Sequence, residues 1–231
     1  MTPRFRTGKA NMDNIAYFLD FEFDTGNTTF YPRPETELLV EKAVDLLSAA
    51  RGHPAPQRIM DIGTGCGSIA ISLTKYMPSS RIVATDISDS ALQIAGENAL
   101  KYGVSDRIDF VKSDLFADIG RNRYKDFFDL IISNPPYVSL EDFPSLSAKT
   151  KEDPYIALSG GTGGMDFYRR IKLAAPFFLK QNGLLLMEIG YDQSASVRGM
   201  LEKSGTFSRI EIYKDYSGID RIVKAEKWTS L

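Results

Sequence analysis

Short apolar runs and amphipathic stretches alternate along the chain from residue 58 to its end. Apolar runs with the composition of buried strands lie at 58–62, 81–85, 108–112, 127–133 and 183–188. Apolar residues at helical spacing predict helices at 68–77, 89–102, 166–179 and 193–204. This alternation is typical of an α/β fold with a mostly parallel sheet. The most apolar runs, 58–62, 127–133 and 183–188, are expected at the centre of that sheet.

The end of the chain carries two further strand patterns, at 209–214 and 221–225, around the turn at Ser217-Gly218. No helix separates them, so we expect them to pair antiparallel. Together these patterns divide the sequence into a flexible leader at 1–15, a hairpin and linking helix at 16–56, and an α/β domain at 57–231.

The segment before the α/β domain reads as a β-hairpin followed by a helix. Aromatic residues alternate over 16–23, residues 24–27 have the composition of a turn, and 28–31 is extended again. The run Pro32-Arg33-Pro34 ends the hairpin, and apolar residues at helical spacing predict a helix over 35–50.

Composition limits the classes of function that remain. The chain has 231 residues, 43% of them hydrophobic, and a net charge of −2, so it lacks the basic excess of a nonspecific nucleic-acid binder. Its one cysteine, Cys66, and one histidine, His53, exclude an internal disulfide and argue against a metal site of the usual Cys/His kind. His53 lies in a loop-like run and is expected at the surface. With no apolar span or signal peptide evident, we expect a cytoplasmic protein that does not bind membranes.

A glycine-rich loop follows the first strand of the α/β domain, in the run Asp61-Ile62-Gly63-Thr64-Gly65-Cys66-Gly67. The next strand ends in Asp86, about 20 residues beyond the loop, the spacing of a carboxylate that binds a ribose hydroxyl. A dinucleotide site favours glycine or alanine where this chain has Ser68, and the acidic Asp61 suits a cation better than a pyrophosphate. The pattern therefore favours S-adenosylmethionine over NAD.

The third strand ends in Ser113-Asp114-Leu115-Phe116. Asp114 has the chemistry to accept a hydrogen bond from an adenine amino group, with Leu115 or Phe116 packed on the ring. On the spacing alone, a helix cap at Asp114 with core neighbours is an equal alternative.

The strand at 127–133 runs directly into Asn134-Pro135-Pro136-Tyr137. The two prolines have no N–H and hold the backbone rigid, so the carbonyl groups and the Asn134 side chain offer acceptors to an NH2 group. Tyr137 supplies a ring on which a planar group can stack. An amide or exocyclic amine nitrogen is a weak nucleophile, and two hydrogen bonds from its protons would orient it for in-line attack on a methyl sulfonium.

These two motifs make the chain resemble the class I S-adenosylmethionine-dependent methyltransferases, which have a Rossmann-like sheet. Within them it resembles the HemK/PrmC family of release-factor glutamine N5-methyltransferases, through 31–37, 157–161, 164–171, 188–193 and 214–221. The resemblance implies methylation of the glutamine in the Gly-Gly-Gln motif of peptide chain release factors, with S-adenosylhomocysteine as product. It makes 57–231 the catalytic domain and Asn134, Pro135, Pro136 and Tyr137 the catalytic and substrate-binding residues.

The resemblance also implies the remaining site residues. The cofactor would be held by Asp61, Gly63, Thr64, Gly65, Cys66, Gly67, Asp86, Ile87, Asp114, Leu115 and Asn134, and the substrate mouth would be lined by Phe30, Arg33 and Glu35. Three features depart from the family: its N-terminal helical domain is absent, Leu115 stands where tryptophan is common, and Glu152-Asp153-Pro154 replaces Phe-Glu-Pro.

Four alternatives remain open from the sequence. A ribosomal-protein glutamine methyltransferase and an N6-adenine or N2-guanine nucleic-acid methyltransferase present the same chemical problem of a planar nitrogen. Against the nucleic-acid enzymes stand the net charge of −2 and the lack of an evident target-recognition domain, so no stable nucleic-acid binding is expected. A non-catalytic binding module fits less well, because the glycine loop and Asn134 are intact. An NAD oxidoreductase fits least well, because of Ser68 and Asp61.

Overall fold

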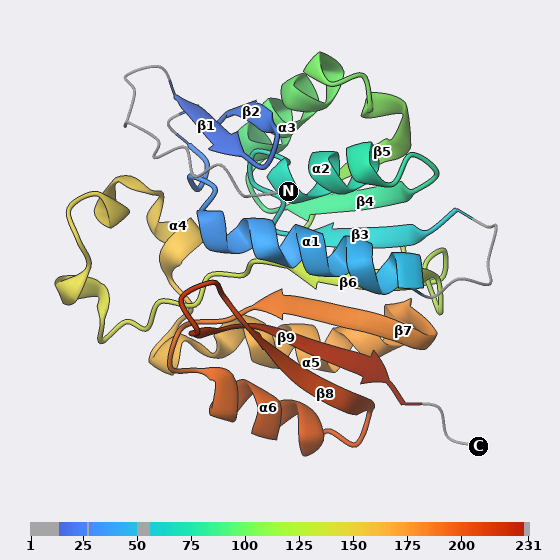
Figure 1. The fold of residues 1–231 in the computed structure, drawn as a ribbon, viewed down its shortest axis with the longest axis vertical. Helices are drawn as coiled ribbons and strands as arrows, with labels where there is room; N and C mark the ends of the chain where they lie inside the picture. The colour runs from blue at the N-terminus through green and yellow to red at the C-terminus, as the bar shows by residue number, and fades with distance from the viewer. Residues whose placement is uncertain (1–13, 27, 50–55, 229–231) are drawn as a thin grey trace.

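The computed structural model describes residues 14–26, 28–49 and 56–228. The predictions for the leader at 1–13, for Asn27 and for His53 fall outside the described residues. The main sheet has seven strands in the order β5-β4-β3-β6-β7-β9-β8 (Figure 1). Its strands are β3 (Arg58–Ile62), β4 (Arg81–Asp86), β5 (Ile108–Lys112), β6 (Phe128–Ser133), β7 (Leu179–Glu188), β8 (Phe207–Lys214) and β9 (Asp220–Lys227).

The strands β3, β4, β5, β6 and β7 pair parallel, whereas β9 pairs antiparallel with both β7 and β8. The predicted α/β fold, its antiparallel C-terminal strands and its three central strands are confirmed. The central strand is β6, with β3 and β7 on either side. Because parallel strands end at the same edge, the loops that follow β3, β4, β5, β6 and β7 meet there.

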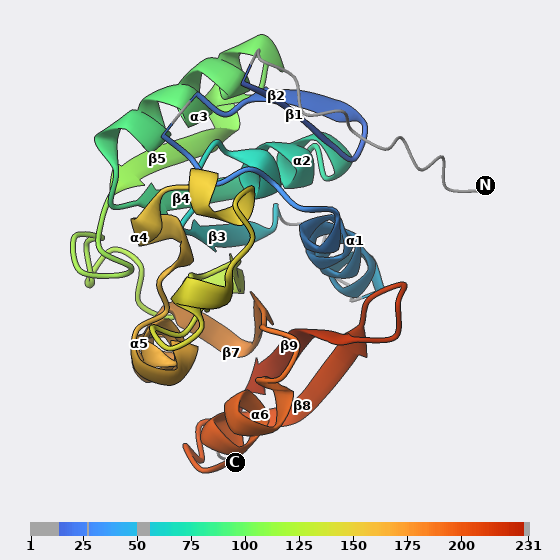
Figure 2. The ribbon, with the colours of Figure 1, turned by 90° about the vertical axis from the view of Figure 1, so that its left-hand side faces the viewer.

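Helices cover both faces of the sheet (Figure 2). The helices are α1 (Pro34–Ala49), α2 (Ser68–Tyr76), α3 (Asp89–Lys101), α4 (Tyr155–Leu158), α5 (Asp166–Phe178) and α6 (Ser194–Glu202). The helices α1, α2 and α3 pack on one face of the sheet, and α5 and α6 pack on the other. Successive strand residues serve the two cores in turn, as Ile59 and Met60 of β3 do.

The hairpin exists, but its predicted turn is wrong. Strand β1 (Ile15–Phe18) pairs with β2 (Phe21–Asp24), so the turn is at Leu19-Asp20, with Leu19 at φ 52°. Residues 28–31 are not a strand. A two-residue turn folds the aromatic run back on itself, which brings Phe18 and Phe23 into the same core, with ring centroids 6.1 Å apart. One continuous strand could not bury both.

Several side chains join the hairpin to the main domain, and one of them, Asn98 of α3, also reaches the glycine loop. The amide of Asn98 accepts from the N–H of Asp24 at 3.0 Å and donates to the carbonyl oxygens of Asp24 and Cys66 at 2.8 and 2.9 Å. These bonds place the hairpin beside the glycine loop.

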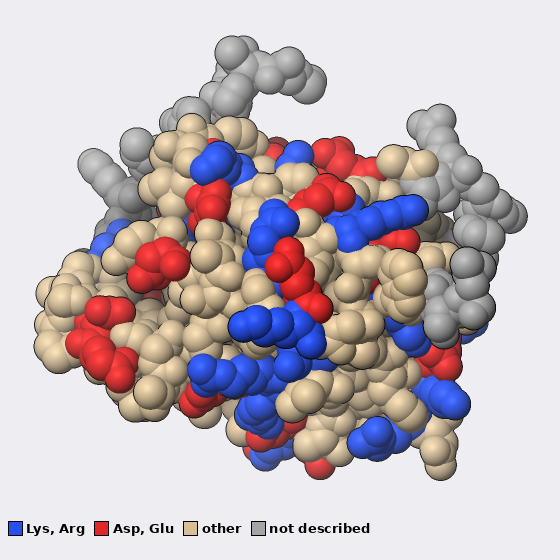
Figure 3. All heavy atoms as spheres, turned by 90° about the horizontal axis from the view of Figure 1, so that it is seen from below, with Lys and Arg blue, Asp and Glu red and all other residues tan. Residues whose placement is uncertain are grey.

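Among the described residues, no helix is long and apolar enough to cross a membrane. The face of the molecule in Figure 3 carries basic and acidic side chains together, in keeping with a net charge of −2.

Candidate active site

A cavity of about 850 Å³ opens at the edge where the parallel strands end. Its walls are the glycine loop after β3, the ends of β4 and β5, the Asn134–Tyr137 turn after β6, and the N-terminal end of α1. Of the predicted site residues, those that line it are Phe30, Arg33, Glu35, Gly63, Thr64, Gly65, Cys66, Asp86, Ile87, Asp114, Leu115, Asn134, Pro135, Pro136 and Tyr137. Asp61 and Gly67 do not line it.

The glycine loop presents bare backbone to the cavity. Gly63 and Gly65 have φ values of +71° and +56°, and a Cβ on either would meet nothing within 4 Å. Glycine is favoured there by the left-handed conformation, and the open space lets a ligand approach the main chain. Gly67 has another role, because a Cβ there would lie 3.2 Å from that of Ala95 on α3.

Asp61 lies beneath the loop and is completely buried. Its Oδ2 accepts from the Thr64 hydroxyl at 2.6 Å, whereas its Oδ1 has no hydrogen-bond partner. Burial raises the pKa of Asp61 to about 7 despite the Thr64 hydrogen bond, and the nearby Asp86 raises it further. An orphaned buried acceptor of this kind is suited to a cationic or N–H-bearing ligand above it.

Asp86 ends β4 and braces the same loop. Its Oδ2 accepts from the N–H of Gly65 at 2.9 Å, and its Oδ1 accepts from the N–H of Ser88 at 3.0 Å. Each carboxylate oxygen retains a lone pair for a ligand hydroxyl. The neighbouring Ile87 is exposed and presents an apolar surface to the cavity.

The end of β5 excludes the helix cap that the sequence allowed at Asp114. Leu115 lines the cavity and has φ 56°, in a turn where the Ser113 hydroxyl donates to its carbonyl at 3.0 Å. Phe116 is buried in the core, stacked on Phe178 with centroids 5.0 Å apart. Asp114 begins no helix, and its Oδ2 is 2.7 Å from a guanidinium nitrogen of Arg170.

The Asn134–Tyr137 turn is held at both ends. The Asn134 amide nitrogen donates to the Thr36 hydroxyl at 3.0 Å. The Tyr137 hydroxyl donates to Glu188 at 3.4 Å, and the Tyr137 carbonyl accepts from the Gln193 amide at 2.9 Å. The two prolines and these contacts orient the turn toward the cavity.

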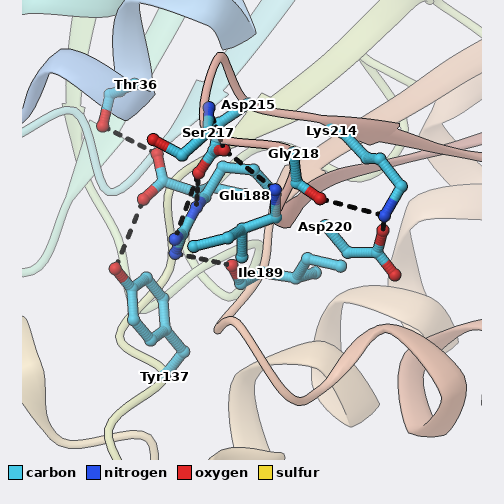
Figure 4. Close-up of polar contacts among 11 residues, drawn as sticks. Thr36, Tyr137, Glu188, Ile189, Lys214, Asp215, Ser217, Gly218 and Asp220 are labelled. Atoms are coloured by element: carbon cyan, nitrogen blue, oxygen red, sulfur yellow. Dashed lines mark hydrogen bonds and ion pairs between the residues drawn. The ribbon is translucent and has the colours of Figure 1, made fainter.

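Thr36 and Glu188 are site residues to which the sequence reasoning gave no role. The Thr36 hydroxyl donates to Glu188 at 2.7 Å, and Figure 4 shows Glu188 between Thr36 and Tyr137. Through Thr36, Glu188 is also connected to Asn134. Burial raises the pKa of Glu188 to about 7, although Thr36 and Arg221 lower it. Both residues belong to the runs 31–37 and 188–193 that carried the family resemblance, which was the available signal.

The N-terminal end of α1 forms one rim of the cavity. Arg33 makes an ion pair with Asp153, which is mostly buried, and its guanidinium lies 5.0 Å from the Phe30 ring centroid. Asp153 also accepts from the N–H of Tyr31 at 3.0 Å. The structure therefore places Phe30, Arg33 and Glu35 together on the rim, with Arg33 engaged by a segment distant in sequence.

Comparison with known proteins agrees with this site. A family model described as "Methyltransferase small domain" matches residues 36–147. A release factor glutamine methyltransferase of Chlorobaculum tepidum is 37% identical over 208 residues, covering 89% of this chain and 70% of the relative. One of Cereibacter sphaeroides is 39% identical over 204 residues, covering 88% and 68%.

Two solved structures share the fold. The N-terminal domain of human METTL16 in complex with SAH superposes with a TM-score of 0.65 at 18% identity, covering 90% of this chain and 76% of that one. A ribosomal protein L11 methylase from Lactobacillus delbrueckii subsp. bulgaricus gives 0.59 at 22% identity, covering 85% and 81%.

The fold and the site define a methyltransferase with the class I α/β fold. The sequence identity to the two relatives, over at least two thirds of their length, also identifies the family within this class. The chain belongs to the release factor glutamine methyltransferase family.

Proposed function

We propose that this chain transfers a methyl group from S-adenosylmethionine to the side-chain amide nitrogen (N5) of the glutamine in the Gly-Gly-Gln motif of peptide chain release factors. The observation that carries the proposal is the Asn134–Tyr137 turn, which opens on the same cavity as the glycine loop. The substrate comes from the family, because the relatives are named release factor glutamine methyltransferases. Such a substrate would place the activity in the cytoplasm.

The cavity residues fit the cofactor. Bound S-adenosylmethionine supplies a methyl group on a positively charged sulfur. Gly63 and Gly65 leave room for a ligand against the main chain, and the Asp86 oxygens have lone pairs for ribose hydroxyls. We assign cofactor binding to Asp61, Gly63, Thr64, Gly65, Cys66, Asp86, Ile87, Asp114 and Leu115. Gly67 supports the loop by its close packing on α3, and Asn134, at the same edge of the sheet, is assigned to the substrate.

Cys66 is the one nucleophilic thiol beside this cofactor site. Its side chain is buried, and burial raises the pKa of the thiol to about 12. A thiol is a far weaker nucleophile than a thiolate, so Cys66 does not compete with the substrate for the methyl group.

The substrate nitrogen is prepared by hydrogen bonding. We assign the oxygen of the Asn134 amide and a backbone carbonyl of the turn as acceptors for the two protons of the glutamine NH2 group. These bonds raise the electron density on the nitrogen and fix its direction of attack. The nitrogen gains the methyl carbon and loses one proton to solvent, and S-adenosylhomocysteine is the second product. Tyr137 contributes its ring to the wall beside the amide.

The rim residues Phe30, Arg33 and Glu35 are proposed to contact the release-factor loop around its glutamine. The Arg33–Asp153 pair supports this, because it joins the start of α1 to the 139–158 segment, which also contributes residues to the cavity wall.

The test is a methyl-transfer assay on a purified release factor, ribosomal proteins and DNA in parallel, read by peptide mass spectrometry. One methyl group on the Gly-Gly-Gln glutamine is the expected product. Label in a ribosomal protein or in DNA, with none on the release factor, would replace this proposal by one of the alternatives.

We expect Asn134→Ala to abolish turnover and to leave the dissociation constant of S-adenosylmethionine nearly unchanged, because the substrate nitrogen loses its acceptor. Gln181→Ala, an exposed position at the other end of β7, is the control and keeps full activity. Calorimetry gives the cofactor affinity. A loss of cofactor binding in Asn134→Ala would contradict the separation of roles.

A further inference from the structure

A buried carboxyl group, Glu188, connects to both ends of the Asn134–Tyr137 turn. Its Oε2 accepts from the Thr36 hydroxyl at 2.7 Å, and its Oε1 accepts from the Tyr137 hydroxyl at 3.4 Å. Thr36 in turn accepts from the Asn134 amide nitrogen at 3.0 Å. Glu188 is only 1% exposed and does not line the cavity, so it acts through its two partners. Thr36 is 3% exposed and forms part of the cavity wall, where its hydroxyl is engaged by Glu188 and Asn134.

The donor and acceptor in each of these hydrogen bonds are fixed by the chemistry of Glu188. Above its pKa of about 7, Glu188 is a carboxylate and has only acceptors, so the Thr36 hydroxyl donates its one proton to the hydrogen bond with Glu188. Thr36 therefore has only lone pairs left for Asn134. An asparagine amide has a donor end and an acceptor end of nearly the same shape, and only its NH2 end can pair with a lone pair. The oxygen of Asn134 is thus directed away from Thr36.

We propose that Thr36 and Glu188 are positioning residues that hold the Asn134 amide in one of its two orientations and thereby make the site select a carboxamide over a carboxylate. The inference rests on the proposed function and deepens it. In the held orientation, Asn134 offers an acceptor to the N–H of glutamine. In the reversed orientation it would offer N–H donors, which suit the carboxylate of glutamate.

A purely structural role makes a different prediction. Thr36 and Glu188 also join α1 to β7, and loss of that contact alone would lower stability without changing which side chain the site prefers. The readouts that separate the two roles are kcat and the inhibition constant of a substrate carrying glutamate in place of glutamine.

The variants are chosen to change one atom group at a time. Thr36→Val removes the hydroxyl and keeps the shape, and Thr36→Ser restores the hydroxyl. Glu188→Gln adds a donor, so Thr36 no longer has a single direction for its proton. Thr74→Val is the matched control, since Thr74 is a fully buried threonine on α2 whose hydroxyl donates to the Ala70 carbonyl.

Each variant is assayed on the intact release factor and on the same factor with the Gly-Gly-Gln glutamine replaced by glutamate, which serves as inhibitor. We expect Thr36→Val to lose about ten-fold in kcat, the effect of one hydrogen bond, with cofactor affinity unchanged. The glutamate factor inhibits Thr36→Val more strongly than wild type. In kcat and in the inhibition constant, Thr36→Ser is close to wild type and Glu188→Gln lies between wild type and Thr36→Val. Thr74→Val has the wild-type values of both.

Several results would overturn the inference. Wild-type kcat and inhibition in Thr36→Val would do so, as would equal losses in Thr36→Val and Thr36→Ser. Should Thr36→Val fail to fold, judged by loss of cofactor binding, Glu188→Gln decides in its place, and an unchanged inhibition constant there refutes the role. Absence of methylation by the wild-type enzyme refutes the proposed function itself, and this inference with it.

Discussion

Replacing Glu188 by glutamine is expected to remove a large part of the pH dependence of stability. Burial raises the pKa of this carboxyl to about 7 from its usual value of 4.5, although the hydroxyl of Thr36 and the charge of Arg221 act in the opposite direction. The folded chain therefore binds a proton at Glu188 more tightly than the unfolded chain does.

The sign and the size follow from that difference. A group with a raised folded-state pKa contributes its full stability below the unfolded-state value of 4.5 and loses it as the pH rises through about 7. A shift of this size corresponds to about 3 kcal/mol, most of which is lost between about pH 5 and about pH 8. Asp61, whose pKa is also raised to about 7, adds a contribution of the same sign.

The assay is urea unfolding of the wild type and of Glu188→Gln near pH 5 and near pH 8. Between these two pH values, we expect the free energy of unfolding of wild type to fall more than that of Glu188→Gln, by about 2.5 kcal/mol. The effect of the new amide on hydrogen bonding is nearly independent of pH, so it cancels in this double difference. Glu202→Gln, a half-exposed carboxyl on α6, is the control and keeps the wild-type dependence.

The reasoning would be refuted by equal pH dependence in wild type and Glu188→Gln. That result would mean that Glu188 is ionised in the folded chain throughout this range, so that Arg221 and the hydroxyl groups compensate its burial fully.

Two further substitutions test the site. Asp86→Asn is expected to weaken the binding of S-adenosylmethionine by about ten-fold or more, as measured by calorimetry. An amide keeps only one of the two acceptor oxygens that bind Gly65, Ser88 and the ribose hydroxyls. Unchanged affinity would show that Asp86 does not bind the ribose. Gly164→Ala is expected to lower the melting temperature, because the new Cβ would lie 2.2 Å from the Tyr137 carbonyl oxygen. Gly163→Ala is the control: its φ of +61° is similar, but its Cβ would meet nothing within 4 Å, so it measures the cost of the backbone conformation alone. Equal melting temperatures for the two alanine variants would contradict the clash.

The α/β part of the fold was predictable because its strands are buried on both faces. Such strands are short, nearly continuous apolar runs, and β3, β6 and β7 stood out for that reason. The start of β7 was missed by four residues, since Leu179–Asn182 precedes Gly183 and mixes polar with apolar positions. The turn of the hairpin was predicted wrongly for another reason. Its turn uses Leu19 at a positive φ, which no turn signal in the sequence marks.

The site likewise contains residues that the sequence pattern locates and residues that it does not. Gly63, Gly65, Asp86 and Asn134 follow strands directly, so strand prediction alone brings them to one edge of the sheet. Thr36 reaches the site from α1, and its partner Glu188 is 152 residues away in the sequence. A contact between side chains from distant elements depends on how α1 lies on the sheet, which local patterns do not specify.

Glu188 also shows how the site and the stability of the fold oppose each other. An apolar residue at the end of β7 would remove the cost of burying a carboxyl, and glutamine would lower it. Neither would fix the direction of the Thr36 hydroxyl as the carboxylate does. An apolar side chain accepts no hydrogen bond from Thr36, and glutamine has a donor of its own. Only a group with acceptors alone fixes the direction of the Thr36 hydroxyl and thereby the orientation of the Asn134 amide, and Glu188 is such a group above its pKa of about 7. On this argument, variants that gain stability at Glu188 above neutral pH are the ones expected to lose discrimination between glutamine and glutamate.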